Sequence, residues 1–258
     1  MRRWLRLYAS IVLLVLYGPL AVMAAFAFNE SKYMRWTKLS LHWFRDLLTD
    51  RNLLDALEDT LVIGAGVTLV SVTMGTLLAL SLSRVRFRGQ RLYNALVTLP
   101  IMVPDIALGI ALLMFFTAIH LPLGRTSVII AQSTFGLSYA ALVIAARLKG
   151  IDRSIEQAAL DLGATPWQAF WKVTFPALRP AILAASLLCF TLSFDDFVIT
   201  YFTTGPGTST IPLEIYGMVR RGVSPKINAL STLLVAASLT LTLLAAWLVR
   251  RPQLRGAR

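Results

Sequence analysis

Charged residues are scarce in this chain. They make up 15% of its 258 residues, against about 25% in an average soluble domain, whereas 57% of the chain is hydrophobic and the mean hydropathy is +0.68. The scarcity is uneven, because long runs carry almost no charge. At about 20 apolar residues per membrane span, these runs accommodate six transmembrane helices and little else. The sequence therefore predicts an all-α polytopic membrane protein, with residues 1–258 forming a single transmembrane domain.

Cysteine and histidine are almost absent as well. The single cysteine, Cys189, lies in an apolar run and has no partner for an internal disulfide, and His42 and His120 lie in different segments without companion ligands. The sequence also lacks a Walker-type Gly-Lys-Ser/Thr motif and a Ser-His-Asp set. We therefore expect no metal site, no cofactor and no enzymatic activity in the chain by itself.

Six apolar runs define the expected spans. The first run also suits a signal peptide, because Arg2 and Arg3 precede it and residues 25–27 (AFA) suit a cleavage site. Its apolar stretch exceeds the usual 7–15 residues, so an uncleaved helix is the favoured interpretation. The expected spans are Tyr8–Phe28, Leu61–Leu82, Ala95–Thr117, Val128–Ala146, Ala181–Thr203 and Ala229–Val249.

The net charge of +12 follows from the short loops and gives no reason to expect a nucleic-acid partner. The N-terminus, residues 83–94, residues 147–180 and the C-terminal tail hold 16 basic and 3 acidic residues, whereas the three opposite loops hold 9 basic and 7 acidic. Short loops rich in Lys and Arg remain on the cytoplasmic side. We therefore expect both termini in the cytoplasm.

Only three acidic residues fall within the expected spans, and no basic residue accompanies them. They are Asp105 in the third span and Asp195 and Asp196 in the fifth. A charged side chain at the centre of a bilayer costs at least about 2.5–3.5 kcal/mol, so such residues must meet a partner, a subunit interface or a wet pathway. The set predicts a cation-selective path, and hydrogen bonding to a neighbouring helix is the structural alternative.

Three further residues complete the predicted pathway. Trp43 and Tyr201 offer cation–π contacts at the outer mouth, although aromatic belts at membrane interfaces also explain such residues. Ser193 precedes the acidic pair in the fifth span. Outside the spans, residues 29–59 carry apolar side chains at helical spacing and predict an amphipathic helix on the outer surface, and residues 205–228 open as a turn-rich loop.

The loop at 147–180 contains two helix starts. Ser154 with Gln157 and Thr165 with Gln168 match the spacing of capping boxes, and Pro166 suits the first helical position. Gly163 suits the end of the first helix. The sequence therefore predicts two short helices joined by a tight turn on the cytoplasmic side, although an interfacial loop lying against the bilayer is the plainer alternative.

This loop resembles the "EAA" signature of bacterial ABC importer permeases: Glu-Ala-Ala, three residues, Gly, nine residues, then Ile-x-Leu-Pro. The matching residues are Gln157, Ala158, Ala159, Gly163 and Pro176. The chain departs from the signature at its first position, where Gln157 replaces Glu and Glu156 stands immediately before it. The resemblance implies that this loop contacts an ATPase, either through Glu156 or through a neutral hydrogen bond.

The resemblance covers most of the chain and points to the second permease of polyamine (spermidine/putrescine) importers. The supporting stretches are 85–89 (VRFRG), 102–106 (MVPDI), 192–196 (LSFDD), 205–207 (GPG) and 223–230 (VSPKINAL). It implies a type I permease fold in the bacterial inner membrane and ATP and Mg²⁺ bound only by a separate ATPase dimer. It also implies a homologous second permease, an external solute-binding protein and membrane lipid as partners.

Two alternatives remain open at the level of sequence. A secondary cation transporter also uses intramembrane Asp residues, but it has no ATPase for the capped helix pair to contact. Within the ABC importers, the alternative substrate is another organic cation or zwitterion, such as an opine or thiamine.

Overall fold

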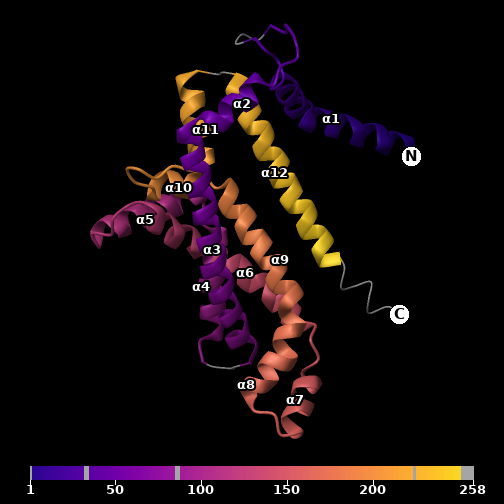
Figure 1. The fold of residues 1–258 in the computed structure, drawn as a ribbon. Coiled ribbons are helices and arrows are strands. Elements are labelled where there is room, and N and C mark those ends of the chain that lie inside the picture. The colour runs from indigo at the N-terminus through magenta and orange to yellow at the C-terminus, as the bar shows by residue number, and fades with distance from the viewer. Residues whose placement is uncertain (1, 32–34, 85–87, 223–224, 251–258) are drawn as a thin grey trace. The chain divides into compact units, whose positions relative to one another are not determined.

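The computed structural model describes residues 2–31, 35–84, 88–222 and 225–250 of the chain (Figure 1). Residues 85–87 of the VRFRG stretch and residues 223–224 of the VSPKINAL stretch lie outside this part. The regular secondary structure of the described residues is helical, apart from one isolated antiparallel bridge between Asn29 and Leu39. Its contacts divide the chain into two compact units: residues 1–57 with 211–239, and residues 58–210 with 240–258.

The helices follow one another along the chain with short connections. Their bounds are α1 (Arg2–Phe26), α2 (His42–Thr49), α3 (Arg51–Arg84), α4 (Gln90–Met102), α5 (Asp105–Ala118), α6 (Arg125–Lys149), α7 (Arg153–Asp161), α8 (Pro166–Ala169), the π-helix η1 (Phe170–Thr174), α9 (Phe175–Asp195), α10 (Val198–Thr203), α11 (Ile211–Arg221) and α12 (Pro225–Arg250).

The prediction of six spans agrees with the helices that are long and apolar enough to cross a membrane. Within the described residues five such helices are continuous, and the number reaches six if α4 and α5, bent by 107° at their junction, form one broken span. The five are Trp4–Phe26, Arg51–Arg84, Arg125–Lys149, Pro166–Asp195 and Pro225–Leu243.

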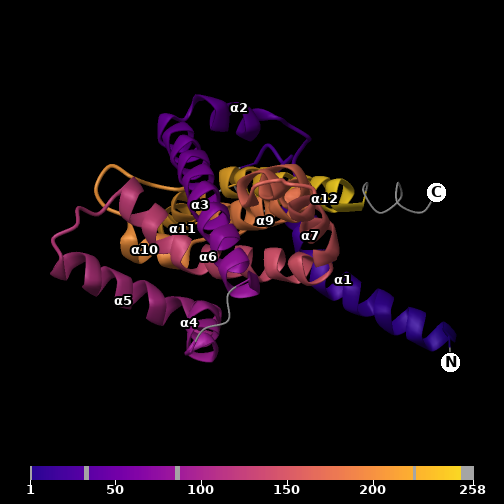
Figure 2. The same ribbon diagram turned by 90° about the horizontal axis from the view of Figure 1, so that it is seen from below.

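The prediction of a continuous third span was wrong. Pro104 has no N–H to donate and forces the preceding residue out of the helical region, and Val103 is accordingly extended, with ψ of 132°. The chain re-enters a helix at Asp105. Figures 1 and 2 show the result, because α5 lies lengthwise in the second view while α4 is seen end-on.

The fifth span is also broken, contrary to the sequence-based prediction. It begins earlier than expected, since α8, η1 and α9 form one apolar helical run from Pro166 to Asp195. It ends at Asp196, whose backbone is extended (φ −69°, ψ 123°), and the chain resumes as α10 at Val198. Both breaks fall at acidic residues of the predicted pathway.

The first unit is held by a small apolar core. Leu47, Leu53 and Ile211 are buried in it, and Trp43 and Phe44 of α2 pack against it half-buried. The amphipathic helix expected within residues 29–59 is therefore real but short, at His42–Thr49, because the chain turns at Asp50 and starts α3. The loop at Gly205 is turn-rich as predicted, and α11 follows it.

The second unit packs around α6, which contributes many buried residues of small size. Close approach depends on glycine: a Cβ at Gly75 of α3 would lie 2.7 Å from the Cβ of Ala140, and one at Gly136 would lie 2.5 Å from the Ser71 hydroxyl. At one end of α6, Arg125 pairs with buried Asp59, whose other oxygen accepts the Ser209 N–H at 2.9 Å. The small residues thus allow α3 and α6 to approach each other closely.

Candidate functional site

The first cavity lies at the two helix breaks of the second unit. It has a volume of about 370 Å³ and is called the acidic cavity below, because all three carboxylates of the predicted pathway line it. None of the described residues that line it is basic. The lining residues are Pro100, Ile101, Asp105, Phe135, Tyr139, Thr191, Leu192, Asp195, Asp196, Phe197 and Val198.

The breaks explain how carboxylates 90 residues apart in sequence come together. Asp105 is the first residue of α5, where a carboxylate interacts favourably with the helix dipole. Asp195 is the last residue of α9, and Asp196 is the extended residue after it. Asp105 and Asp195 are exposed, whereas Asp196 is half-buried.

Asp196 carries the structural role that the sequence left open. Its Oδ2 accepts hydrogen bonds from the Thr200 N–H and hydroxyl, both at 2.8 Å, and from Gln132 Nε2 at 3.0 Å. Gln132 is fully buried on α6, and its Oε1 accepts a hydrogen bond from the buried Ser193 hydroxyl. The Asp196 side chain therefore caps the start of α10 and ties it to α6, and Ser193 belongs to this network and does not line the cavity.

The aromatic residues of the cavity were missed at the level of sequence. Phe135 and Tyr139 lie one turn apart on α6 with ring centroids 6.2 Å apart, and Phe197 follows the acidic pair. The i, i+4 spacing of the first two predicts that they share a face, but not which way the face points. Tyr201 stacks on Phe197 at 5.5 Å without lining the cavity. Trp43 belongs to the first unit, where its indole N–H donates to the Asn29 carbonyl at 2.9 Å.

The loop at 147–180 begins with a different cap from the expected one. Asp152, not Ser154, is the N-cap of α7, and its carboxylate accepts the Ser154 N–H at 2.9 Å. Hydrogen bonds from the Ser154 backbone and side chain lower the pKa of the Asp152 carboxyl below its usual value. The capping-box prediction for Ser154 with Gln157 was therefore wrong, because Asp152, an equally good capping residue two positions earlier, takes the N-cap position.

The second helix start is confirmed. The Thr165 hydroxyl accepts the Gln168 N–H, the Gln168 side chain accepts the Thr165 N–H, and Pro166 takes the first helical position. Gly163 joins the two helices with a φ of +89°, in the left-handed region that glycine adopts at little cost. The turn between α7 and α8 therefore depends on this glycine.

The second short helix, however, is not separate. It passes through one π-helical turn at Phe170–Thr174 into α9, with Pro176 near the start of α9. Trp171 packs edge-on against Trp167 at 5.6 Å and against Phe175 at 4.7 Å between ring centroids. α8, η1 and α9 are thus continuous, and the far end of α9 carries Asp195.

Glu156 is paired inside the chain. Its Oε2 lies 2.8 Å from an Arg84 guanidinium nitrogen and accepts the Thr174 hydroxyl at 2.9 Å, while Arg153 donates to the Ser83 carbonyl. These contacts fix α7 against the end of α3 and the start of α9. The other signature residues are presented outwards, since Gln157 and Ala158 are exposed and Ala159 is half-buried.

Membrane-spanning helices, an interior acidic cavity and a protruding capped helix pair together define a membrane transport subunit. The comparisons with known proteins agree. Residues 71–253 match the model of the family described as "Binding-protein-dependent transport system inner membrane component".

Curated relatives and solved structures give the same result. The chain is 38% identical over 251 residues to the putrescine transport system permease PotI of Escherichia coli K12, covering 94% of this chain and 89% of the relative. It is 35% identical to the spermidine/putrescine permease PotC of the same organism, covering 93% and 91%. A bacterial ABC transporter that imports alginate has the same fold, with a TM-score of 0.75 at 21% identity over 97% of this chain and 96% of that one.

The chain therefore belongs to the binding-protein-dependent transport inner membrane family. It is a multi-pass permease subunit of a bacterial ABC importer in the inner membrane, and it works with a solute-binding protein and an ATPase. The ATPase is a separate component, so this chain is not an enzyme by itself, and the family carries no cofactor.

Proposed function

We propose that this permease moves a polyamine, putrescine or spermidine, across the inner membrane. The acidic cavity carries the proposal, because Asp105, Asp195 and Asp196 line it together without a basic residue. Two similar permeases bear putrescine and spermidine in their names. A linear amine with two or three ammonium groups supplies the positive charges that such a set of carboxylates favours during passage.

The rest of the cavity suits the same class of substrate. The faces of Phe135, Tyr139 and Phe197 attract ammonium groups through cation–π interactions and pack against the methylene chain between them. Asp105 and Asp195 are exposed to the cavity, whereas the hydrogen bonds to Asp196 restrict its orientation. We assign direct contact with ammonium groups to Asp105 and Asp195, and a mixed structural and electrostatic role to Asp196.

The loop at 147–180 is proposed to dock on the ATPase. Ala158 and Ala159 keep one face of α7 small, which permits close approach of another protein. The carboxylate of Glu156 is already bound to Arg84 and Thr174, so Gln157 offers the ATPase a neutral hydrogen bond in its place. Gly163 sets the angle between α7 and α8. Pro176 lies in the first turn of α9, the helix that carries a displacement of α8 to the acidic cavity.

The partner in the membrane is proposed to be a homologous second permease, and not a second copy of this chain. We propose one permease domain over residues 1–258, with both termini in the cytoplasm and an ATPase dimer beneath the permease pair. Co-purification through a tag on this chain tests the pairing. Recovery of the ATPase with this chain as a homodimer, and with no second permease, would overturn it.

Uptake by cells tests the substrate. Cells lacking this subunit, and the same cells complemented with it, are compared for uptake of labelled putrescine, spermidine and thiamine. The proposal expects polyamine uptake to depend on the subunit and thiamine uptake to be unaffected. Unchanged uptake of both polyamines in the deletion strain, or restoration of thiamine uptake alone, would refute the polyamine assignment.

A further inference from the structure

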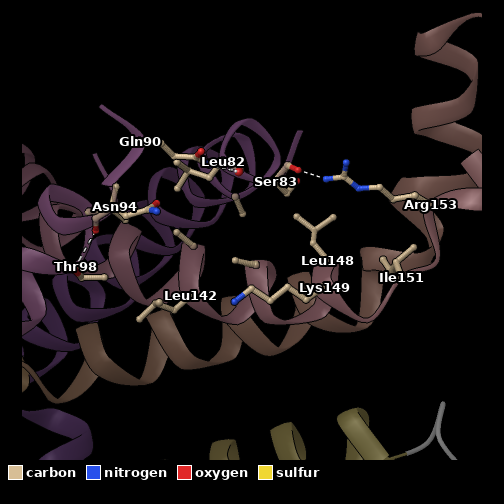
Figure 3. Close-up of a pocket in the computed structure, with 14 residues that line it drawn as sticks. Leu82, Ser83, Gln90, Asn94, Thr98, Leu142, Leu148, Lys149, Ile151 and Arg153 are labelled. Atoms are coloured by element: carbon tan, nitrogen blue, oxygen red, sulfur yellow. Dashed lines mark hydrogen bonds between the residues drawn. The ribbon is translucent and has the colours of Figure 1, made fainter. Parts of the chain in front are cut away.

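A second and larger cavity lies in the same unit, beside the start of the loop at 147–180. It has a volume of about 730 Å³ between the end of α3, the start of α4 and the end of α6 (Figure 3). Among the described residues that line it, Lys149 and Arg153 are the charged ones, so it is called the basic cavity below. The other lining residues are Ala79, Leu82, Ser83, Gln90, Asn94, Val97, Thr98, Ala141, Leu142, Ala145, Leu148 and Ile151.

Within the described part of the chain, neither Lys149 nor Arg153 forms an ion pair with a carboxylate. Asp152 is bound to the Ser154 N–H as the cap of α7, and Glu156 is bound to Arg84 and Thr174. Arg153 uses one nitrogen on the Ser83 carbonyl, and a guanidinium has five N–H donors in all. Lys149 and Arg153 thus favour an anion.

The walls of the cavity favour an apolar chain attached to that anion. Val97, Leu142 and Leu148 form an apolar wall, and Figure 3 shows Leu142 and Leu148 on the α6 side of the cavity. Two of its polar side chains are already bonded within the chain, since Gln90 donates to the Leu82 carbonyl and Thr98 to the Asn94 carbonyl. A free inorganic anion leaves this apolar surface uncovered.

The cavity lies at the end of the unit that the Lys and Arg distribution assigns to the cytoplasm. Anionic phospholipids accumulate in that leaflet, and basic pockets between transmembrane helices on that side bind their headgroups. We propose that the basic cavity binds one anionic phospholipid. Lys149 and Arg153 hold its phosphate, and an acyl chain lies along Val97, Leu142 and Leu148.

Lys149 is the residue to change, because Arg153 also holds α7 against α3. The full importer complex is purified in detergent, and phosphatidylglycerol and phosphatidylcholine retained per complex are counted by native mass spectrometry during titration. Lys149→Gln is expected to weaken phosphatidylglycerol binding about fivefold. The matched control is Lys172→Gln, which removes the same charge from the exposed face of η1, outside the cavity, and is expected to leave binding unchanged.

A second variant tests the apolar wall without changing the charge. Ala145→Phe fills the cavity and is expected to reduce phosphatidylglycerol retention, and glycerol phosphate is expected not to compete. Equal retention of both lipids by the wild type, equal weakening by Lys149→Gln and Lys172→Gln, or full competition by glycerol phosphate would overturn the proposal. These outcomes are independent of the polyamine assignment, which rests on which amine the cells take up.

Discussion

The two cavities of the second unit share α6 but have opposite charge. The acidic cavity meets α6 at Phe135 and Tyr139 and is lined by three carboxylates, whereas the basic cavity meets it at Leu142, Leu148 and Lys149 and is lined by two cationic side chains. Less than three helical turns of α6 separate Tyr139 from Lys149. One helix therefore serves a cation-attracting and an anion-attracting environment.

The difference in charge corresponds to two roles: the acidic cavity serves substrate passage, and the region of the basic cavity serves lipid binding and the attachment of α7. In the acidic cavity, charge is concentrated where two helices break, and Asp105 and Asp195 are exposed there. Near the basic cavity, polar contacts also fix α7 in place, through Arg84 with Glu156 and Arg153 with the Ser83 carbonyl. We expect charge substitutions in the acidic cavity to alter substrate transport. Near the basic cavity, we expect coupling to depend mainly on the backbone geometry of the loop at 147–180.

The largest effect is expected at the turn of the loop. Gly163→Val should abolish polyamine uptake, because a β-branched residue strains a φ of +89° and changes the angle between α7 and α8. Uptake is measured per amount of protein in the membrane. Gly163→Asn is the control, since Asn adopts the left-handed region more readily, and it should retain part of the activity. Full activity in the Val variant would show that the turn does not determine coupling.

The next effect concerns the charge of the acidic cavity. Asp105→Asn and Asp195→Asn keep the size of the side chain and remove its charge. A contact at about 4 Å is worth about 4 kcal/mol at an effective dielectric near 20, much of it offset by desolvation, so about 1–3 kcal/mol or roughly 5- to 150-fold in transport efficiency is expected.

The matched control for these variants is Asp55→Asn, which removes an exposed carboxylate on α3 outside the cavity and should change uptake by less than about twofold. Asp196→Asn is a less direct test, because it also weakens the bonds to Thr200 and Gln132. Wild-type uptake by both Asp105→Asn and Asp195→Asn would show that the negative charge of the acidic cavity does not affect transport.

A smaller effect is expected for the ion pair that fixes α7. Arg84→Glu places like charges together and should reduce uptake by about two- to fivefold, because a partly exposed pair contributes up to about 1 kcal/mol. The exchange of both residues, Arg84→Glu with Glu156→Arg, should recover part of the loss. ATP hydrolysis per amine transported is the second measurement. An additive loss in the double variant would contradict a role for the pair itself.

The smallest effect on transport is expected in the basic cavity. Lys149→Gln should change polyamine uptake by less than about twofold, since the residue is exposed and lies outside the substrate pathway. Uptake is measured in the same cells as for the Asp variants. A loss as large as that of Asp105→Asn would place Lys149 on the substrate pathway and remove the distinction between the cavities.

Much of the fold follows from local sequence. Apolar runs predict the spans, and the Thr165 and Gly163 signals predict the turn because their chemistry is contained within a few residues. The helix breaks were missed for two different reasons. Pro104 ends a helix that the apolar run alone predicts to be continuous. The Asp196 side chain, at the other break, is bonded both to Thr200 nearby and to Gln132, 64 residues away.

The candidate site also contains some features that the sequence predicts and others that it does not. Acidic residues in apolar runs are recognisable without a structure, because their burial cost demands an explanation. The aromatic partners Phe135 and Tyr139 are not, since their type is ordinary in a membrane helix and only the rotation of α6 directs them to the cavity. The pairing of Glu156 with Arg84, 72 residues away, was likewise beyond a local reading of the loop.

The most direct test of the central claim is the dependence of uptake on substrate charge. The importer is reconstituted in vesicles, and the efficiencies of spermidine and putrescine uptake are compared for the wild type and for the variant combining Asp105→Asn with Asp195→Asn. If the carboxylates act on the substrate, the triamine loses more than the diamine, and the ratio of spermidine to putrescine efficiency falls. An unchanged ratio with wild-type rates for both amines would show that the acidic cavity does not select a polycation.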